Sequence, residues 1–133
     1  MNIVQPIRNP AQIDAMKRVL LRQNPRNYFL FLLGINIGLR ISDLIPLQVK
    51  DLQGSHIVIQ EMKTGKQKRF FINNQLRSEI NAYTANSAPD DYIFPSQKGG
   101  YISRIQAYNI LNTAAREVGL QQIGTHTMRK TFG

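Results

Sequence analysis

The sequence predicts a mainly helical domain of the α+β class with one small antiparallel β-hairpin. Helix start signals, in which Asn or Ser precedes an apolar pattern of helical spacing, recur along most of the chain. One compact β-branched stretch is followed by a turn signal, which is typical of a hairpin. No internal repeat, low-complexity tract or linker interrupts the 133 residues, so we expect a single domain with its own core.

The first two helices are each expected to begin at an Asn-Pro pair. Asn9-Pro10 and Asn24-Pro25 place a capping residue before a proline at the first helical position. The first helix should run to about Gln23. The second contains residues 28–37, which are apolar nearly all round, and should end at Gly38. This pattern predicts that the second helix is the central core helix.

Arg40 follows the core helix directly and precedes a short helix. Ser42 is expected to cap that short helix and Pro46 to limit it. Spacing alone leaves two interpretations of Arg40 open. It could satisfy the carbonyl groups at the end of the preceding helix, or it could serve a binding site.

A β-hairpin is expected after this junction. His56–Gln60 and Lys68–Ile72 have the composition of strands, and Lys63–Lys66 contains a turn signal. The stretch from 62 to 78 is basic and contains no acid. Such a run is usually a solvated face, but a rigid hairpin that carries Lys can also contact phosphates in a groove. Its basic residues are Lys63, Lys66, Lys68, Arg69 and Arg77.

Two further helices complete the predicted fold. Asn73 should cap one of them, and Ser103 should cap the other, which Gly119 ends. The first of these helices keeps one apolar stripe of Leu76, Ile80 and Tyr83. The residues of the second that are expected to face the core are Ile105, Tyr108, Leu111, Ala115 and Val118.

Charge and composition narrow the class of partner. Seventeen Lys and Arg against eight Asp and Glu give a net charge of +9. This charge favours nucleic acid as the partner and, less strongly, an anionic membrane surface; the plain alternative is that the charge only keeps the protein soluble. Without cysteine the chain has no disulfide framework and no thiolate metal site. The longest apolar run, 28–33, is too short to span a bilayer, and the N-terminus lacks a signal-peptide pattern. We therefore expect a cytoplasmic protein without membrane contact.

Four residues are candidates for phosphate chemistry: Arg40, Lys63, His126 and Arg129. In a helix, His126 and Arg129 would share one face, where a guanidinium can bind two phosphate oxygens and an imidazole can carry a proton near neutral pH. A Lys can protonate a departing alkoxide. No spacing of carboxylates or His predicts a metal site, so we expect the chemistry to need no metal and no cofactor.

The order of three motifs resembles that of tyrosine recombinases, the phage integrase family. The motifs are residues 38–44 (Gly-Leu-Arg-Ile-Ser-Asp-Leu), the turn Lys63–Lys66, and residues 126–129 (His-Thr-Met-Arg), and the resemblance extends from about residue 8 to the end. It implies the integrase catalytic-domain fold and site-specific recombination or integration of double-stranded DNA. Strands would be cut and rejoined through a 3′-phosphotyrosine, without metal.

The resemblance also implies roles for individual residues. Arg40 and Arg129 would clamp the scissile phosphate, and Lys63 would be the general acid for the leaving 5′-hydroxyl. His126 would bind the same phosphate and assist proton transfer, while Asp43 would support the site from behind. The basic residues expected to contact DNA are Lys66, Lys68 and Arg69.

Two departures from the family pattern shape our expectations. The family continues to a tyrosine nucleophile beyond the His-x-x-Arg motif, and it usually carries a separate N-terminal core-binding domain. We expect residues 1–133 to be a single catalytic domain that lacks both, binds DNA weakly and in a salt-sensitive way, and does not cleave it. The full-length protein would form a homo-oligomer on DNA. The tyrosines expected to be structural are Tyr28, Tyr83, Tyr92, Tyr101 and Tyr108.

Two other functions remain open. One is a non-catalytic DNA-binding module or integrase remnant that uses the same basic surface. The other is a metal-free phosphodiesterase that acts on RNA through His126 and Lys63, although the sequence offers no second catalytic His.

Overall fold

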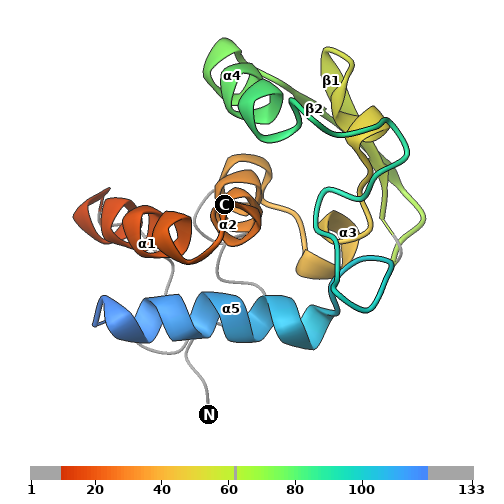
Figure 1. The fold of residues 1–133 in the computed structure, drawn as a ribbon. Coiled ribbons are helices and arrows are strands. Elements are labelled where there is room, and N and C mark those ends of the chain that lie inside the picture. The colour runs from red at the N-terminus through yellow and green to blue at the C-terminus, as the bar shows by residue number, and fades with distance from the viewer. Residues whose placement is uncertain (1–9, 62, 120–133) are drawn as a thin grey trace.

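The computed structural model describes residues 10–61 and 63–119. Three helices, α1 (Pro10–Gln23), α2 (Pro25–Ile37) and α5 (Arg104–Glu117), pack against one another as the body of the molecule (Figure 1). A fourth, α4 (Asn74–Tyr83), lies above α2 in this view. The only sheet in the described residues has two strands, so the expected α+β class is confirmed.

The core is built around α2, as its composition predicts. Phe29, Phe31 and Leu33 are at most 1% exposed, and residues on all sides of this helix are buried. The helix begins where expected, because the Asn24 side chain accepts a hydrogen bond from the backbone N–H of Arg26 at 2.9 Å. Gly38 ends it with a φ of 72°, a conformation that glycine adopts without strain.

The short helix α3 (Ile41–Leu44) corrects one expectation. Ser42 lies inside this helix and does not cap it; Arg40 occupies the N-cap position, with no side-chain capping bond. The helix starts two residues earlier than a cap at Ser42 predicts, because Ile41 and Leu44 are both buried in the core, and packing overrides the local cap preference. A 3₁₀ turn, η1 (Val49–Leu52), leads from there towards the sheet.

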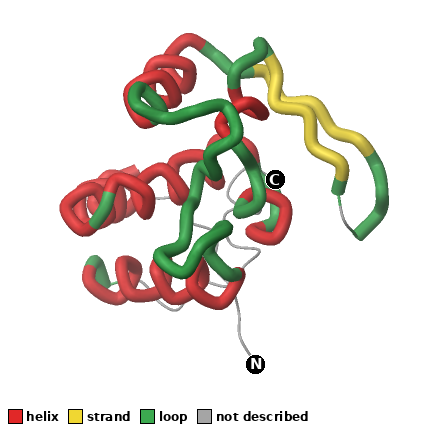
Figure 2. Tube along the Cα trace, turned by 45° about the vertical axis from the view of Figure 1, so that its right-hand side comes forward, coloured by secondary structure: helices red, strands yellow, loops and turns green. Residues whose placement is uncertain are grey.

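The hairpin projects away from the stacked helices (Figure 2). Strands β1 (His56–Gln60) and β2 (Gln67–Phe71) are antiparallel, with His56 opposite Phe71 and Gln60 opposite Gln67. The second strand thus begins and ends one residue earlier than predicted. Ile72 follows it, is buried, and leads the chain into the cap of α4.

The N-caps of α4 and α5 agree with the sequence prediction, whereas Asn9, the predicted cap of α1, lies outside the described residues. The Asn73 side chain accepts from the N–H of Leu76 at 2.8 Å, and the Ser103 hydroxyl accepts from that of Gln106 at 3.0 Å. The expectation that Ile105 faces the core is wrong, because its side chain is 71% exposed. Small residues on another face of α5, among them Ala107 and Ala114, are the ones fully buried, so this helix lies close to its neighbours.

Candidate nucleic-acid interface

Arg40 lies where the helical body meets the hairpin. Its backbone follows the left-handed Gly38 and begins α3, so the side chain is fixed at its base by buried residues on both sides. The side chain is 22% exposed. Its buried Nη1 atom makes no hydrogen bond to any residue that the structure describes. Arg40 is therefore not holding the end of α2 through Nη1.

Glu61 faces Arg40 from the end of β1, and sequence reasoning missed it. Its carboxylate is 3% exposed; Oε2 lies 3.9 Å from Nη1 of Arg40 and 3.5 Å from Nζ of Lys68. Glu61 gave no signal in the sequence, because it is a single acid that lies just before the basic stretch from 62 to 78. A buried acid at that position is nevertheless the group that joins the hairpin to Arg40.

The turn that carries Lys63 is anchored to the same glutamate. The backbone N–H of Gly65 donates to the Glu61 carbonyl at 2.8 Å, and the Thr64 hydroxyl donates to the Glu61 carboxylate at 3.1 Å. Gly65 has a φ of 69°, the conformation this turn requires. Lys63 itself is exposed. The exposed Lys63 therefore lies on a turn that is held by Glu61, the residue that faces Arg40.

The basic residues of the hairpin and of α4, which follows it, do not form one uniform patch. Lys66 and Arg69 are exposed, whereas Lys68 lies on the inner face, opposite Ile59, and pairs with Glu61. Arg77 is committed to structure, because it donates to the carbonyl of Leu52 at 2.8 Å and to that of Gly54. Fewer side chains are therefore free to meet phosphate than the sequence count implies.

The other predicted site residues fall into two groups. Asp43 is buried in α3, and its backbone N–H donates to the Arg40 carbonyl at 3.0 Å, so it lies against the candidate site. His126 and Arg129 lie outside the described residues. Within the described ranges, His, Asp and Glu nowhere form a group of three or more that could hold a metal ion.

Two of the described tyrosines, Tyr28 and Tyr83, are held by hydrogen bonds to other parts of the fold. The Tyr28 hydroxyl donates to Glu79 at 2.5 Å, and that of Tyr83 donates to the Ile93 carbonyl at 2.6 Å. Burial raises the pKa of Tyr28 to about 12, and the hydrogen bond to Glu79 and its charge act in the same direction. Burial likewise raises the pKa of Tyr83 to about 12, against a lowering effect of Arg26. Because a raised pKa disfavours the phenolate, neither tyrosine is prepared as a nucleophile.

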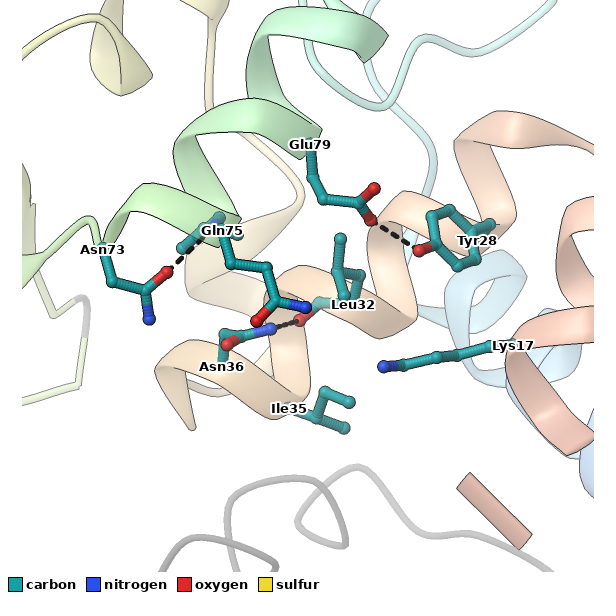
Figure 3. A pocket seen from close by; sticks show the side chains of 9 residues that line it. Lys17, Tyr28, Leu32, Ile35, Asn36, Asn73, Gln75 and Glu79 are labelled. Carbon is teal, nitrogen blue, oxygen red and sulfur yellow. Dashed lines mark hydrogen bonds between the residues drawn. The ribbon is translucent and has the colours of Figure 1, made fainter. Parts of the chain in front are cut away.

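A separate hollow of about 280 Å³ lies between α1, α2 and α4 (Figure 3). Its polar groups largely satisfy one another or the backbone: Tyr28 bonds Glu79, and the Asn36 side chain donates to the Leu32 carbonyl at 2.8 Å. Lys17 reaches in from α1 (Figure 3). Neither Arg40 nor Glu61 lines this hollow, so it is distinct from the candidate interface.

The fold of the chain is similar to that of solved recombinase structures. Solved structures of XerA recombinase and of a lambda integrase dimer bound to a COC′ core site superpose with TM-scores of 0.77 and 0.76, at 16% and 15% sequence identity. The matches cover 99% and 98% of this chain, and 49% and 52% of those chains. The chain therefore has the fold of a recombinase catalytic domain.

The chain belongs to the phage integrase family, whose model matches residues 9–133. It is 51% identical over 135 residues to the probable integrase/recombinase YoeC of Bacillus subtilis (strain 168), covering 100% of this chain and 75% of that relative. It is 32% identical over 117 residues to the type 1 fimbriae regulatory protein FimE of Escherichia coli (strain K12), covering 81% and 59%. The chain thus spans between about half and three-quarters of these relatives, and the predicted resemblance is confirmed.

Across the described residues, no helix has both the length and the apolar character that crossing a membrane requires.

Proposed function

We propose that this chain binds double-stranded DNA and supplies the phosphate-activating residues of a tyrosine-type site-specific recombinase. Its similarity to YoeC, a probable integrase/recombinase, extends over the whole chain and supports this function. The net charge of +9 and the exposed Lys63, Lys66 and Arg69 provide the attraction to a polyanion. A cytoplasmic location, with no metal or cofactor, is part of the proposal.

The chemistry divides among a few side chains. A tyrosine oxygen forms a bond to the scissile phosphorus, the bond from phosphorus to the 5′-oxygen breaks, and Lys63 gives a proton to that oxygen. Arg40 and Arg129 bind the non-bridging oxygens as their charge grows, while His126 assists removal of the proton from the attacking tyrosine hydroxyl and Asp43 supports Arg40 from α3. Reversal of these steps on another strand rejoins the DNA. No described tyrosine is assigned as the nucleophile.

The observation that carries the proposal is the state of Arg40. A guanidinium is most useful to a phosphate when its position is fixed and its donors are unspent, since the fork then binds two oxygens at little entropic cost. Arg40 meets the first condition, because its base is held between α2 and α3, and one of its donor atoms, Nη1, makes no hydrogen bond among the described residues.

Binding of a fluorescent DNA duplex, followed by anisotropy over a range of salt concentrations, tests the proposal. We expect weak binding that falls steeply with salt, and a loss of about tenfold for Arg40→Ala, the effect of one charged hydrogen bond. Arg116→Ala, in the last turn of α5, is the matched control that removes the same charge elsewhere. Equal losses in the two variants would contradict a specific role for Arg40, and tight binding that ignores salt would contradict the proposed interface.

Assembly on DNA is also part of the proposed function. One solved relative of this fold, lambda integrase, is a dimer on a COC′ core site and a tetramer on a Holliday junction. We propose that the complete protein likewise acts as a homo-oligomer on its DNA, since exchanging strands needs a cutting site for each strand. Cross-linking in the presence and absence of duplex measures this directly, and oligomers that form equally without DNA would contradict it.

A further inference from the structure

Glu61 contacts several groups at the base of the hairpin. Its carboxylate is 3% exposed and lies within ion-pairing distance of Arg40 and Lys68, at 3.9 and 3.5 Å. It also accepts the Thr64 hydroxyl at 3.1 Å, while its backbone N–H donates to the Lys66 carbonyl at 2.9 Å. One acid therefore touches the residue proposed to bind phosphate and fixes the turn that carries the proposed general acid.

The pair between Glu61 and Arg40 is close enough to share charge but too long for a hydrogen bond. At 3.9 Å the two atoms exceed the range of about 2.7–3.2 Å in which an N–H donor and an oxygen bond well. The carboxylate thus compensates the charge of a largely buried guanidinium and leaves its donor unspent. Carboxylate and phosphate oxygens offer a guanidinium the same kind of acceptor, so Glu61 and a DNA phosphate are alternative partners for Arg40.

We propose that Glu61 is a positioning residue that holds Arg40 and Lys68 at the base of the hairpin and competes with the DNA phosphate for them. This inference rests on the proposed function, since it names the residue that sets the strength of phosphate binding at the same site. Before DNA binds, Glu61 keeps Arg40 beside the turn of Lys63. When a phosphate binds, Arg40 and Lys68 must first separate from the carboxylate, and the free energy of that separation lowers the net affinity for DNA.

Glu61→Gln separates this role from a purely structural one. The amide keeps an oxygen that can accept the Thr64 hydroxyl, but it carries no charge to compete with phosphate. If Glu61 only shapes the turn, the variant leaves DNA affinity unchanged or lowers it. If Glu61 competes, the variant binds DNA more tightly.

Anisotropy titrations with duplex DNA at low salt measure the competition. We expect Glu61→Gln to bind about three- to tenfold more tightly than the wild type, and its plot of log affinity against log salt to steepen by about one, because another cation meets phosphate. Asp90→Asn is the matched control, since Asp90 is an exposed acid that pairs with Lys50 at 3.2 Å. In an Arg40→Ala background, Glu61→Gln should gain less than it does in the wild type, because only Lys68 is then left to be released. A gain in the wild-type background that only equals that of Asp90→Asn overturns the proposal.

Thermal unfolding without DNA tests the pairing independently. We expect Glu61→Gln to lower the melting temperature by a few degrees. The decrease should be smaller in an Arg40→Met background, because the guanidinium charge that Glu61 compensates is then absent. Shifts that simply add in the double variant overturn the proposed pairing, whatever the DNA result. Coupled shifts with no DNA binding by any variant would instead overturn the proposed function, and the competition with it.

Discussion

The helical body and the hairpin use the same types of residue for opposite purposes. Among the helices, Phe31 of α2 is fully buried and Arg77 of α4 binds two backbone carbonyls. On the hairpin, Phe71 is 68% exposed and Arg69 lies in solvent. Residue type alone therefore does not tell structure from function in this chain; the contacts made by each side chain do.

The two regions also differ in what fixes their conformation. Helix α2 is surrounded by its neighbours, so packing specifies it from all sides. The hairpin has one buried face, where Ile57 and Ile59 pack inward, and one open face that includes Val58. Its turn depends on hydrogen bonds to Glu61. The body can thus absorb changes to its surface, whereas the hairpin depends on a few polar contacts.

The largest expected contrast comes from the same substitution made in both regions. Phe31→Ala should lower the free energy of unfolding by about 3–5 kcal/mol, because it opens a cavity in the core. Phe71→Ala should lower it by less than about 1 kcal/mol, since most of that ring is already in water and its main aromatic contact is an edge-on His56 at 5.5 Å. Urea unfolding measures both, and equal losses would contradict the division between body and hairpin.

A pair of arginines should show a smaller contrast. Arg77→Met removes the donors to the Leu52 and Gly54 carbonyls, and we expect it to lower the free energy of unfolding by about 1–3 kcal/mol. Arg69→Met, on the exposed strand, should stay within about 0.5 kcal/mol of the wild type. Should Arg69→Met prove the more harmful of the two in urea, the assignment of Arg77 to structure would be wrong.

The helix ends could be predicted because their signals are local. Asn24, Gly38 and Ser103 each act through groups within a few residues of their own position, so the sequence contains the whole interaction. The cap at Ser42 and the inward face at Ile105 were wrong because burial of neighbouring residues decided both. Local preference is worth a fraction of a kcal/mol to about 1 kcal/mol, and core packing outweighs it.

The candidate site also contains residues with a local sequence signal and one residue without such a signal. Arg40 and the Lys63 turn could be named as candidates, because each belongs to a short motif that the family resemblance identifies, and their functional roles stay predictions. The role of Glu61 could not be predicted, since its partner Arg40 lies 21 positions earlier in the sequence and no motif links the two residues. Contacts between elements of this kind are set only when the hairpin docks on the body.

Alkaline pH should destabilise the body through two tyrosines. The pKa of Tyr28 and of Tyr83 is about 12 in the folded state, against 10.0 for an unperturbed tyrosine. Each folded pKa is raised, so their contribution to stability is fully present below pH 10 and is lost as pH rises towards 12. Urea midpoints measured from pH 9 to 12 should fall less steeply in the Tyr28→Phe, Tyr83→Phe double variant than in the wild type. An unchanged slope would show that neither hydroxyl is held as the structure indicates.

The smallest expected effect on stability is also the one that bears most directly on function. Replacing Lys66 and Arg69 together by Ala should change the free energy of unfolding by no more than about 0.5 kcal/mol, because both side chains are exposed. The same double variant should weaken DNA binding several-fold and reduce the salt slope by about two, since two phosphate contacts are lost. A variant that unfolds like the wild type and still binds DNA like the wild type would remove the open strand from the proposed interface. Binding would then depend on the residues around Arg40, where the hairpin is joined to the body.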